Sequence, residues 1–291
     1  MGKDQQGPIV QQLDTRPYPN FLFIGTSKAG SSWIYEILLE HQEVFVPRAK
    51  DIQFFDYEYH RGLDWYLSFF ASAKQEKAVG ELSHDYFLRE ESAARIRECL
   101  PGVRLLCSLR EPASQILSSF LQHQTAFLNS GTSLREFAFQ EDVLRACDYY
   151  YNLRPFYRLF SRENILVLFF DELERDPASF AQEIFRFLDV NPSFVPDVLE
   201  KRVLSAREPR LVWLAHLVYR IGQQFRHMGM PNLVGVVKRN RAFQRLLYKP
   251  VNEKPEMPED LETAIRDYFR ERYKELEDLI GQPLPEGWAN N

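Results

Sequence analysis

The chain has 291 residues, of which 45% are hydrophobic and 26% are charged, and this composition excludes a low-complexity or disordered protein. A formal net charge of −5 excludes a general electrostatic attraction to nucleic acid, and the sequence has no run of about 18 apolar residues that could span a membrane. Three cysteines without metal-ligand spacing, together with an N-terminus without an apolar leader segment, predict a cytoplasmic protein.

A loose, polar lead-in over residues 1–19 precedes the first predicted strand, which is the apolar run 21–24. Apolar side chains at helical spacing after residue 32 predict a helix. The turn between strand and helix is rich in Gly, Ser and Thr. Its N–H groups and the helix start are suited to a doubly charged anion, to which Lys28 adds a positive charge and Ser31 and Ser32 add hydroxyl groups.

This turn contains the two glycines of a Walker A loop but not its lysine. In that motif the lysine directly follows the second glycine. Here Ser31 follows Gly30, and the lysine lies two residues before that glycine, at Lys28. The loop is therefore poorly suited to a γ-phosphate with magnesium, and an ordinary strand-to-helix turn with a surface lysine remains the alternative.

Further apolar segments alternate with predicted helices along the chain. The strands are expected at 78–84, 103–109 and 165–170, and the helices at 63–70, 90–100, 112 onward, 133–160 and 178–188. Apolar strands that alternate with helices predict an α/β fold with a parallel sheet covered on both faces, which binds ligands at the carboxyl ends of its strands. Lys28, His84 and Arg110 fall at or just past such ends.

The C-terminal third has a different character. Residues 209–252 contain eight Lys or Arg and no Asp or Glu, with apolar residues at helical spacing. The segment is either a core-covering helix pair with a solvated basic face or a wall for an anionic or amphipathic acceptor or a membrane surface. An acidic helix is expected from about residue 260 to 280. We expect one domain over residues 20–291, with 209–252 as a basic helical insertion or acceptor-side subdomain.

The segment from Lys28 to Trp33 resembles the 5′-phosphosulfate loop of sulfotransferases, whose pattern is Lys-x-Gly-Thr/Ser-Thr/Ser-Trp. These enzymes take a sulfuryl group from 3′-phosphoadenosine 5′-phosphosulfate (PAPS) and release adenosine 3′,5′-bisphosphate (PAP). The resemblance implies a P-loop-like fold and no metal ion. It also implies that Trp33 stacks near the adenine and that the phosphosulfate is held by Lys28 and the N–H groups of Ala29, Gly30, Ser31, Ser32 and Trp33.

Arg110 and Ser118 form a second candidate anion site. Arg110 ends a predicted strand, and Ser118 lies eight residues later, about two helical turns into the next element. A guanidinium and a hydroxyl group at this spacing can bind one phosphate. In sulfotransferases an Arg with Ser at plus eight binds the 3′-phosphate of the donor, which the resemblance implies here. A structural ion pair of Arg110 with Glu111 or Glu81 is the alternative.

Two segments supply candidates for the catalytic base. Residues 50–56, Lys-Asp-Ile-Gln-Phe-Phe-Asp, resemble the Lys-Glu-x-His-Phe-Phe-Asp segment of glycan sulfotransferases, with Asp51 in place of the proposed base. Residues 80–86 resemble the family's Gly-Glu-Lys-Ser-Pro-x-Tyr, with Leu82 in place of the lysine, and align His84 with the base of the small-molecule branch. A histidine suits proton removal near neutral pH, so His84 is the first choice and Asp51 the second. A loop histidine bonded to the backbone is the alternative.

The family's second 3′-phosphate loop, rich in Lys, Gly and Arg, has two candidates here. One is the segment 249–257, with Lys249 and Lys254, just before the last predicted helix. The other is the group Lys201, Arg202 and Arg207.

The resemblance therefore implies direct in-line transfer of a sulfuryl group from PAPS to a hydroxyl or amine of a sugar, lipid or small natural-product acceptor. The basic segment suits an anionic or amphipathic acceptor, and no nucleic acid partner is expected. Two other functions stay open: a P-loop kinase for a small molecule, and a non-catalytic nucleotide-binding relative that acts through the basic segment 209–252. The sequence leaves the acceptor and the oligomeric state undetermined.

Overall fold

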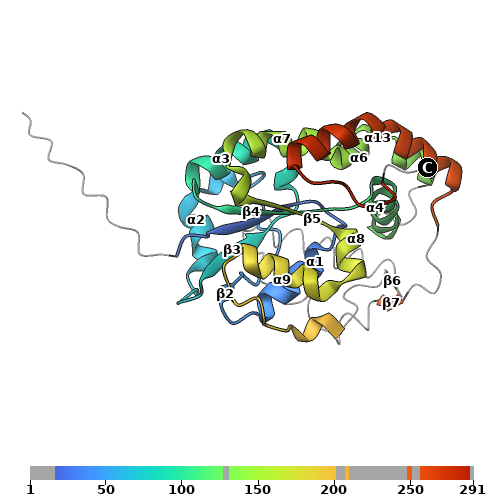
Figure 1. Cartoon of the computed structure of the whole chain (residues 1–291). Helices are drawn as coiled ribbons and strands as arrows, with labels where there is room; N and C mark the ends of the chain where they lie inside the picture. Colours follow the sequence, from blue (N-terminus) through green and yellow to red (C-terminus); the bar gives the residue numbers. More distant parts are fainter. Residues whose placement is uncertain (1–16, 127–130, 201–206, 210–247, 251–255, 289–291) are drawn as a thin grey trace, which may run out of the picture.

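Five parallel strands form the central sheet of the structure, a computed structural model that describes residues 17–126, 131–200, 207–209, 248–250 and 256–288 (Figure 1). The strand order is β2-β3-β1-β4-β5, and each neighbouring pair is parallel. The strands are β1 (Phe21–Gly25), β2 (Val44–Phe45), β3 (Ala78–Leu82), β4 (Arg104–Leu109) and β5 (Ile165–Phe169). This sheet confirms the predicted α/β class.

Helices connect these strands and cover both faces of the sheet. The α-helices are α1 (Ser31–Glu40), α2 (Leu63–Leu67), α3 (Glu90–Cys99), α4 (Pro112–Ala126), α5 (Leu134–Ala138), α6 (Glu141–Cys147), α7 (Tyr149–Leu159), α8 (Phe170–Arg175), α9 (Pro177–Phe187) and α13 (Glu259–Ile280). The short 3₁₀ helices are η1 (Tyr59–Arg61), η2 (Ser68–Phe70), η3 (Tyr86–Leu88), η4 (Arg162–Asn164) and η5 (Asp197–Glu200).

Each strand contributes side chains to two hydrophobic cores, one on each face of the sheet. Figure 1 shows α3, α7 and α13 above the sheet and α1 and α9 below it. Along β1, Leu22 and Ile24 belong to the upper core, whereas Phe21 and Phe23 belong to the lower core. Because successive side chains point to opposite faces, a strand covered on both sides is mostly apolar along its whole length.

Gly80 permits the close pairing of β3 with β1. It lies directly opposite Phe21, and a Cβ atom at this position would come within 2.2 Å of the Phe21 carbonyl oxygen. A side chain here would push the two strands apart. Because β3 and β1 carry the two halves of the candidate site described below, this glycine keeps those halves close together.

The segment predicted as helical from 133 to 160 is divided into three helices, α5, α6 and α7. The Ser133 hydroxyl accepts a hydrogen bond from the Glu136 N–H, and the Glu136 carboxylate accepts one from the Ser133 N–H. Before α7, the Asp148 carboxylate accepts a hydrogen bond from the Tyr151 N–H. Such caps start new helices because they satisfy N–H groups that would otherwise lack partners.

Several predictions concern residues outside the described part of the chain. Residues 1–16 of the lead-in and 210–247 of the basic segment are among them, so the single domain over 20–291 and the helical insertion stay predictions. At the two ends of the basic segment, β6 (Arg207–Pro209) and β7 (Tyr248–Pro250) pair antiparallel. Among the described helices, none combines the length and the apolar character needed to cross a membrane.

Candidate active site

The loop between β1 and α1 lies at the carboxyl end of the sheet, and its backbone conformation depends on glycine. Gly30 has φ 87° as the residue that precedes α1, and a Cβ atom there would come within 2.8 Å of Leu173. Lys28 also has a positive φ, of 65°. Both conformations bend the chain so that the loop residues lie beside the first turn of α1.

Neighbouring elements hold this loop in place. The Thr26 N–H donates to the Ser108 carbonyl at 3.0 Å, and the Ser108 hydroxyl donates to the Ala29 carbonyl at 2.7 Å. From α4, the Gln115 side-chain amide donates to the Thr26 hydroxyl at 3.3 Å. The donor loop predicted from the sequence is therefore anchored to β4 and α4 by residues that its motif does not contain.

Three cations surround the loop. The Lys28 ammonium donates to the Gln122 side-chain oxygen at 3.0 Å, and one Arg110 guanidinium nitrogen donates to the Lys28 carbonyl at 3.0 Å. Lys50, which was not among the predicted site residues, lies close enough to affect Lys28 electrostatically. Burial, followed by the positive charges of Arg110 and Lys50, lowers the pKa of Lys28 to about 8. An anion at this place would relieve that repulsion.

Arg110 faces the loop and makes neither of the ion pairs considered as alternatives. Its guanidinium lies over the Phe170 ring at 4.4 Å, and its carbonyl accepts a hydrogen bond from the Tyr149 hydroxyl at 2.5 Å. The Glu111 carboxylate instead accepts hydrogen bonds from two N–H groups at the start of α4. The buried Glu81 carboxylate accepts hydrogen bonds from Tyr86 and Ser83.

Ser118 lies on the α4 face that contacts the loop. It is three residues after Gln115 and four before Gln122, and those two side chains bond Thr26 and Lys28 respectively. Residues three and four apart share one face of a helix, so Ser118 shares the side of α4 that is turned toward the loop. The pairing of Ser118 with Arg110 on one phosphate stays a prediction.

Trp33 packs into the lower hydrophobic core. Its side chain is only 8% exposed and packs edge-on against Phe180 of α9, with ring centroids 5.8 Å apart. Its N–H donates to the Gly30 carbonyl at 2.9 Å. The indole is therefore part of the lower core, and its stacking near an adenine stays a prediction. Because the Trp33 N–H already has a partner, the N–H groups of residues 29–32 are the stronger candidates for binding an anion.

The two candidate bases form one hydrogen-bonded pair. Nδ1 of His84 lies 2.6 Å from an Asp51 carboxylate oxygen, and Nε2 lies 3.5 Å from an oxygen of Asp85. Burial alone would lower the pKa of His84, but the charge and hydrogen bond of Asp51, helped by Asp85, raise it above the usual value. The His84 side chain is partly buried, with 27% of it exposed.

A buried carboxyl group holds the segment that carries Asp51. The Tyr86 and Ser83 hydroxyls donate to the two oxygens of Glu81 at 2.5 and 2.7 Å. The same hydroxyls accept hydrogen bonds from the N–H groups of Phe54 and Gln53 respectively. Burial raises the pKa of Glu81 to about 8. Glu81 was not predicted as part of the site, because a single acidic residue in an apolar strand does not reveal what it bonds.

The C-terminal candidates for the 3′-phosphate are only partly described. Lys249 lies in β7 and pairs with Glu208, and Arg207 of the alternative group lies in β6 and pairs with Pro250. Lys249 and Arg207, one from each candidate group, thus lie on neighbouring strands of one small sheet. Lys254, like Lys201 and Arg202, lies outside the described residues.

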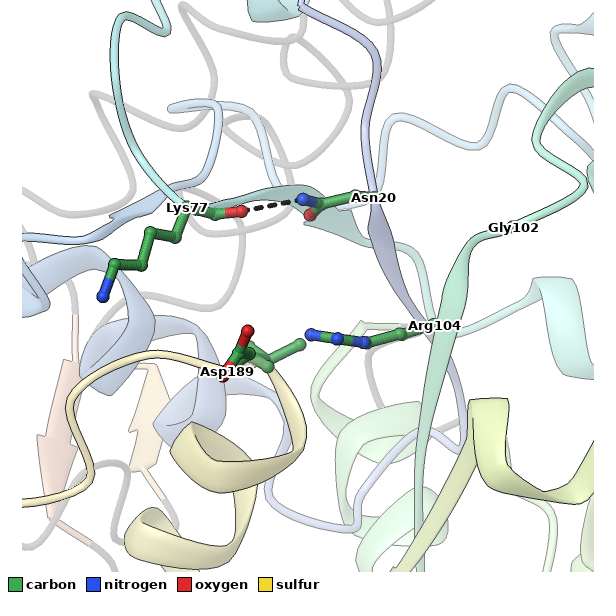
Figure 2. Close-up of a pocket in the computed structure, with 6 residues that line it drawn as sticks. Asn20, Lys77, Gly102, Arg104 and Asp189 are labelled. Atoms are coloured by element: carbon green, nitrogen blue, oxygen red, sulfur yellow. Dashed lines mark hydrogen bonds between the residues drawn. The ribbon is translucent and has the colours of Figure 1, made fainter.

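A cavity of about 400 Å³ lies at the opposite end of the sheet from these residues (Figure 2). Asn20 and Arg104 line it just at the start of β1 and β4, and Lys77 lines it just before β3. Figure 2 shows the Asn20 amide donating to the Lys77 carbonyl, a 2.8 Å hydrogen bond. This cavity is therefore separate from the loop after β1.

Across the part of the chain that the structure describes, no group of three or more His, Cys, Asp or Glu could hold a metal ion.

Comparisons with known proteins agree on one family. The family model described as "Sulfotransferase domain" matches residues 18–277. The chain is 25% identical over 295 residues to bifunctional heparan sulfate N-deacetylase/N-sulfotransferase 4 of Mus musculus, covering 92% of this chain and 31% of that protein. It is 25% identical over 197 residues to heparan sulfate glucosamine 3-O-sulfotransferase 3A1 of Mus musculus, covering 63% of this chain and 49% of that protein.

One solved structure has the same fold over nearly the whole chain. It is a sulfotransferase from Alicyclobacillus acidocaldarius, with a TM-score of 0.69 and 22% identity, covering 94% of this chain and 100% of that one. By contrast, the chain spans about a third of the length of the bifunctional relatives, at 31%.

Proposed function

The chain belongs to the sulfotransferase family, and from that premise we propose that it transfers a sulfuryl group from PAPS to a hydroxyl or amino group of an acceptor. One observation carries the proposal. The hydrogen-bonded pair of Asp51 and His84 follows β3, and the cationic loop follows β1, its neighbour in the sheet. A base and an anion site thus lie at the same edge of the sheet, as transfer between a bound donor and an acceptor requires.

On the donor side, Lys28 and the N–H groups of residues 29–32 would hold the phosphosulfate, and Arg110 with Ser118 would hold the 3′-phosphate. The pKa of Lys28, lowered to about 8 mainly by burial and further by the positive charges of Arg110 and Lys50, supports this assignment, because an anion would compensate those charges. PAPS supplies the activated sulfuryl group. Lys28 then stabilises the negative charge that develops on the oxygen between sulfur and phosphorus.

On the acceptor side, His84 would remove the proton from the attacking group through Nε2. Asp51 accepts the hydrogen bond of Nδ1–H at 2.6 Å, orients the ring and stabilises the imidazolium that forms. We thus propose that Asp51 and His84 act together as the catalytic base, a role for which the sequence offered them as alternatives. The relatives named for heparan sulfate favour a sugar acceptor over a lipid or another small molecule.

The three free cysteines support a reducing, cytoplasmic location.

Two variants and a matched control test the proposal. Lys28→Ala should lower kcat for transfer from labelled PAPS by about 100-fold or more, because it removes a preorganised charge from the leaving oxygen. Arg110→Ala should weaken binding of PAP about 10- to 100-fold and leave binding of AMP, which lacks the 3′-phosphate, nearly unchanged. Arg104→Ala, at the opposite end of the sheet, should change neither quantity.

The proposal fails if Lys28→Ala and Arg110→Ala leave transfer and PAP binding intact. It also fails if the wild-type protein binds ATP with magnesium but not PAP, which would favour a kinase. PAP binding without transfer to any acceptor in a panel of glycans, lipids and phenols would favour a non-catalytic relative.

A further inference from the structure

Lys50 reaches the donor loop from a different part of the chain. Its ammonium donates to the hydroxyl groups of Ser31 and Ser32 at 3.0 and 3.1 Å. These serines are the first two residues of α1, where N–H groups and the helix dipole already favour a negative charge. The ammonium therefore lies at the place where an anion bound by this loop would meet the helix.

The path of the backbone explains why Lys50 and its neighbour Asp51 serve different parts of the site. Asp51 has a left-handed backbone conformation, with φ 61°, and its N–H donates to the Leu82 carbonyl at 2.9 Å. From this bend Asp51 reaches His84 at the end of β3, whereas Lys50 reaches α1. Two adjacent residues thus link the base to the donor loop.

Lys50 adds a third cation to the loop that Lys28 and Arg110 already border. The positive charge of Lys50 is close enough to lower the pKa of Lys28. Two ammonium groups and a guanidinium that repel one another around one loop form a site for a multiply charged anion.

We propose that Lys50 is a donor-binding residue that contacts the 5′-phosphate end of PAPS, together with Lys28 and the first turn of α1. The proposal rests on the proposed function. When the donor binds, the ammonium of Lys50 exchanges its hydrogen bonds with the Ser31 and Ser32 hydroxyls for charge-assisted hydrogen bonds to the phosphate oxygens. The serine hydroxyls then become free to donate to the same group.

Calorimetric binding of PAP and of adenosine 3′-monophosphate tests this role, because the two ligands differ only in the 5′-phosphate. Lys50→Met keeps the length of the side chain and removes its charge. It should weaken PAP binding about 10- to 100-fold and leave binding of the 3′-monophosphate unchanged. Lys50→Arg should retain more of the PAP affinity than Lys50→Met. Lys74→Met, at an exposed lysine in the connection before β3, is the matched control and should bind PAP like the wild type.

Thermal unfolding of each variant checks that the fold is intact, and each binding outcome has a distinct meaning. Normal PAP binding by Lys50→Met overturns the inference alone, even if transfer is lost, because that result would assign Lys50 to holding the Asp51 segment. Equal weakening of both ligands, or equal loss in Lys50→Met and Lys50→Arg, also overturns it. A wild-type protein that does not bind PAP overturns the proposed function and this inference with it.

Discussion

At the scale of single residues, the pair of His84 and Asp51 determines how the site responds to pH. A histidine acts as a base only when it is neutral, and the facing carboxylates raise its pKa above the usual 6.5 despite its burial. The rate of wild-type transfer should therefore fall as the pH decreases through this raised pKa, because the imidazole becomes protonated. The raised pKa makes His84 a stronger base, but His84 can act only at a pH high enough to keep its imidazole neutral.

Asp51→Asn should move the acidic limb of the pH profile of kcat/KM to lower pH, because it removes the charge that raises the His84 pKa. It should also lower the plateau rate about 10- to 100-fold, because an amide does not stabilise the imidazolium. The measurement is the pH dependence of labelled sulfuryl transfer for the variant and for Asp64→Asn, an exposed control. An acidic limb that stays at the wild-type pH would contradict the pairing.

At the scale of elements, the segment from 50 to 56 is attached to β3 through Glu81. Two chains of hydrogen bonds run from the backbone N–H groups of Gln53 and Phe54, through the Ser83 and Tyr86 hydroxyls, to the two Glu81 oxygens. This network holds the bend from which Lys50 and Asp51 diverge. Buried networks of this kind specify one conformation when every member has its partner.

Glu81→Gln should change how stability depends on pH. Burial raises the Glu81 pKa from 4.5 to about 8, so between these values the folded state holds a proton that the unfolded state has released. The free energy of unfolding of the wild type should therefore decrease as the pH rises through that window. The variant lacks this dependence, so its stability relative to the wild type should increase with pH.

Urea unfolding at pH 5, 6.5 and 8 measures that difference, and Glu98→Gln serves as an exposed control on α3. If the free energies of unfolding of the wild type and Glu81→Gln differ by the same amount at all three pH values, Glu81 is ionised in the folded protein throughout, which would contradict this prediction. Transfer activity of the variant gives a second readout, since a loosened segment would misplace Asp51 and lower kcat.

At the scale of the whole molecule, the C-terminal segment packs behind Arg110, which we propose to bind the donor. Trp288 is 1% exposed, contacts the rings of Tyr149, Phe169 and Tyr273, and its indole N–H donates to Asp171 at 3.3 Å. Tyr149 in turn donates to the carbonyl of Arg110. A residue near the end of the chain thus packs behind the arginine that follows β4.

Trp288→Ala should lower the free energy of unfolding by about 3–5 kcal/mol, the usual cost of removing a fully buried aromatic side chain. It should also weaken PAP binding, because Tyr149 loses the ring that supports its position behind Arg110. Chemical unfolding and calorimetry measure the two effects. The control is Tyr268→Ala on α13, where the side chain is 56% exposed and both effects should be small. Equal stability of the two variants would contradict this role of Trp288.

The sequence alone determined those features of the protein that depend on residues adjacent in the chain. The apolar runs of β1, β4 and β5 predicted a parallel sheet, because a strand buried on both faces is predominantly apolar. The turn from Lys28 to Ser32 was predicted between a strand and a helix, and Arg110 was predicted at the end of a strand, as the structure has them. That these residues bind an anion stays a prediction. Each signal depends on local spacing only.

Only the tertiary structure decided which of these residues meet. Asp51 and His84 are 33 positions apart and were alternatives in the sequence, yet they form one hydrogen-bonded pair. Lys50 reaches Ser31 across 19 positions, and Trp33, which the motif assigned to the adenine, is buried against α9. The reason is physical: the strand order places β3 beside β1, and the path of the segment between them depends on a buried carboxyl group and left-handed residues that no local pattern reveals.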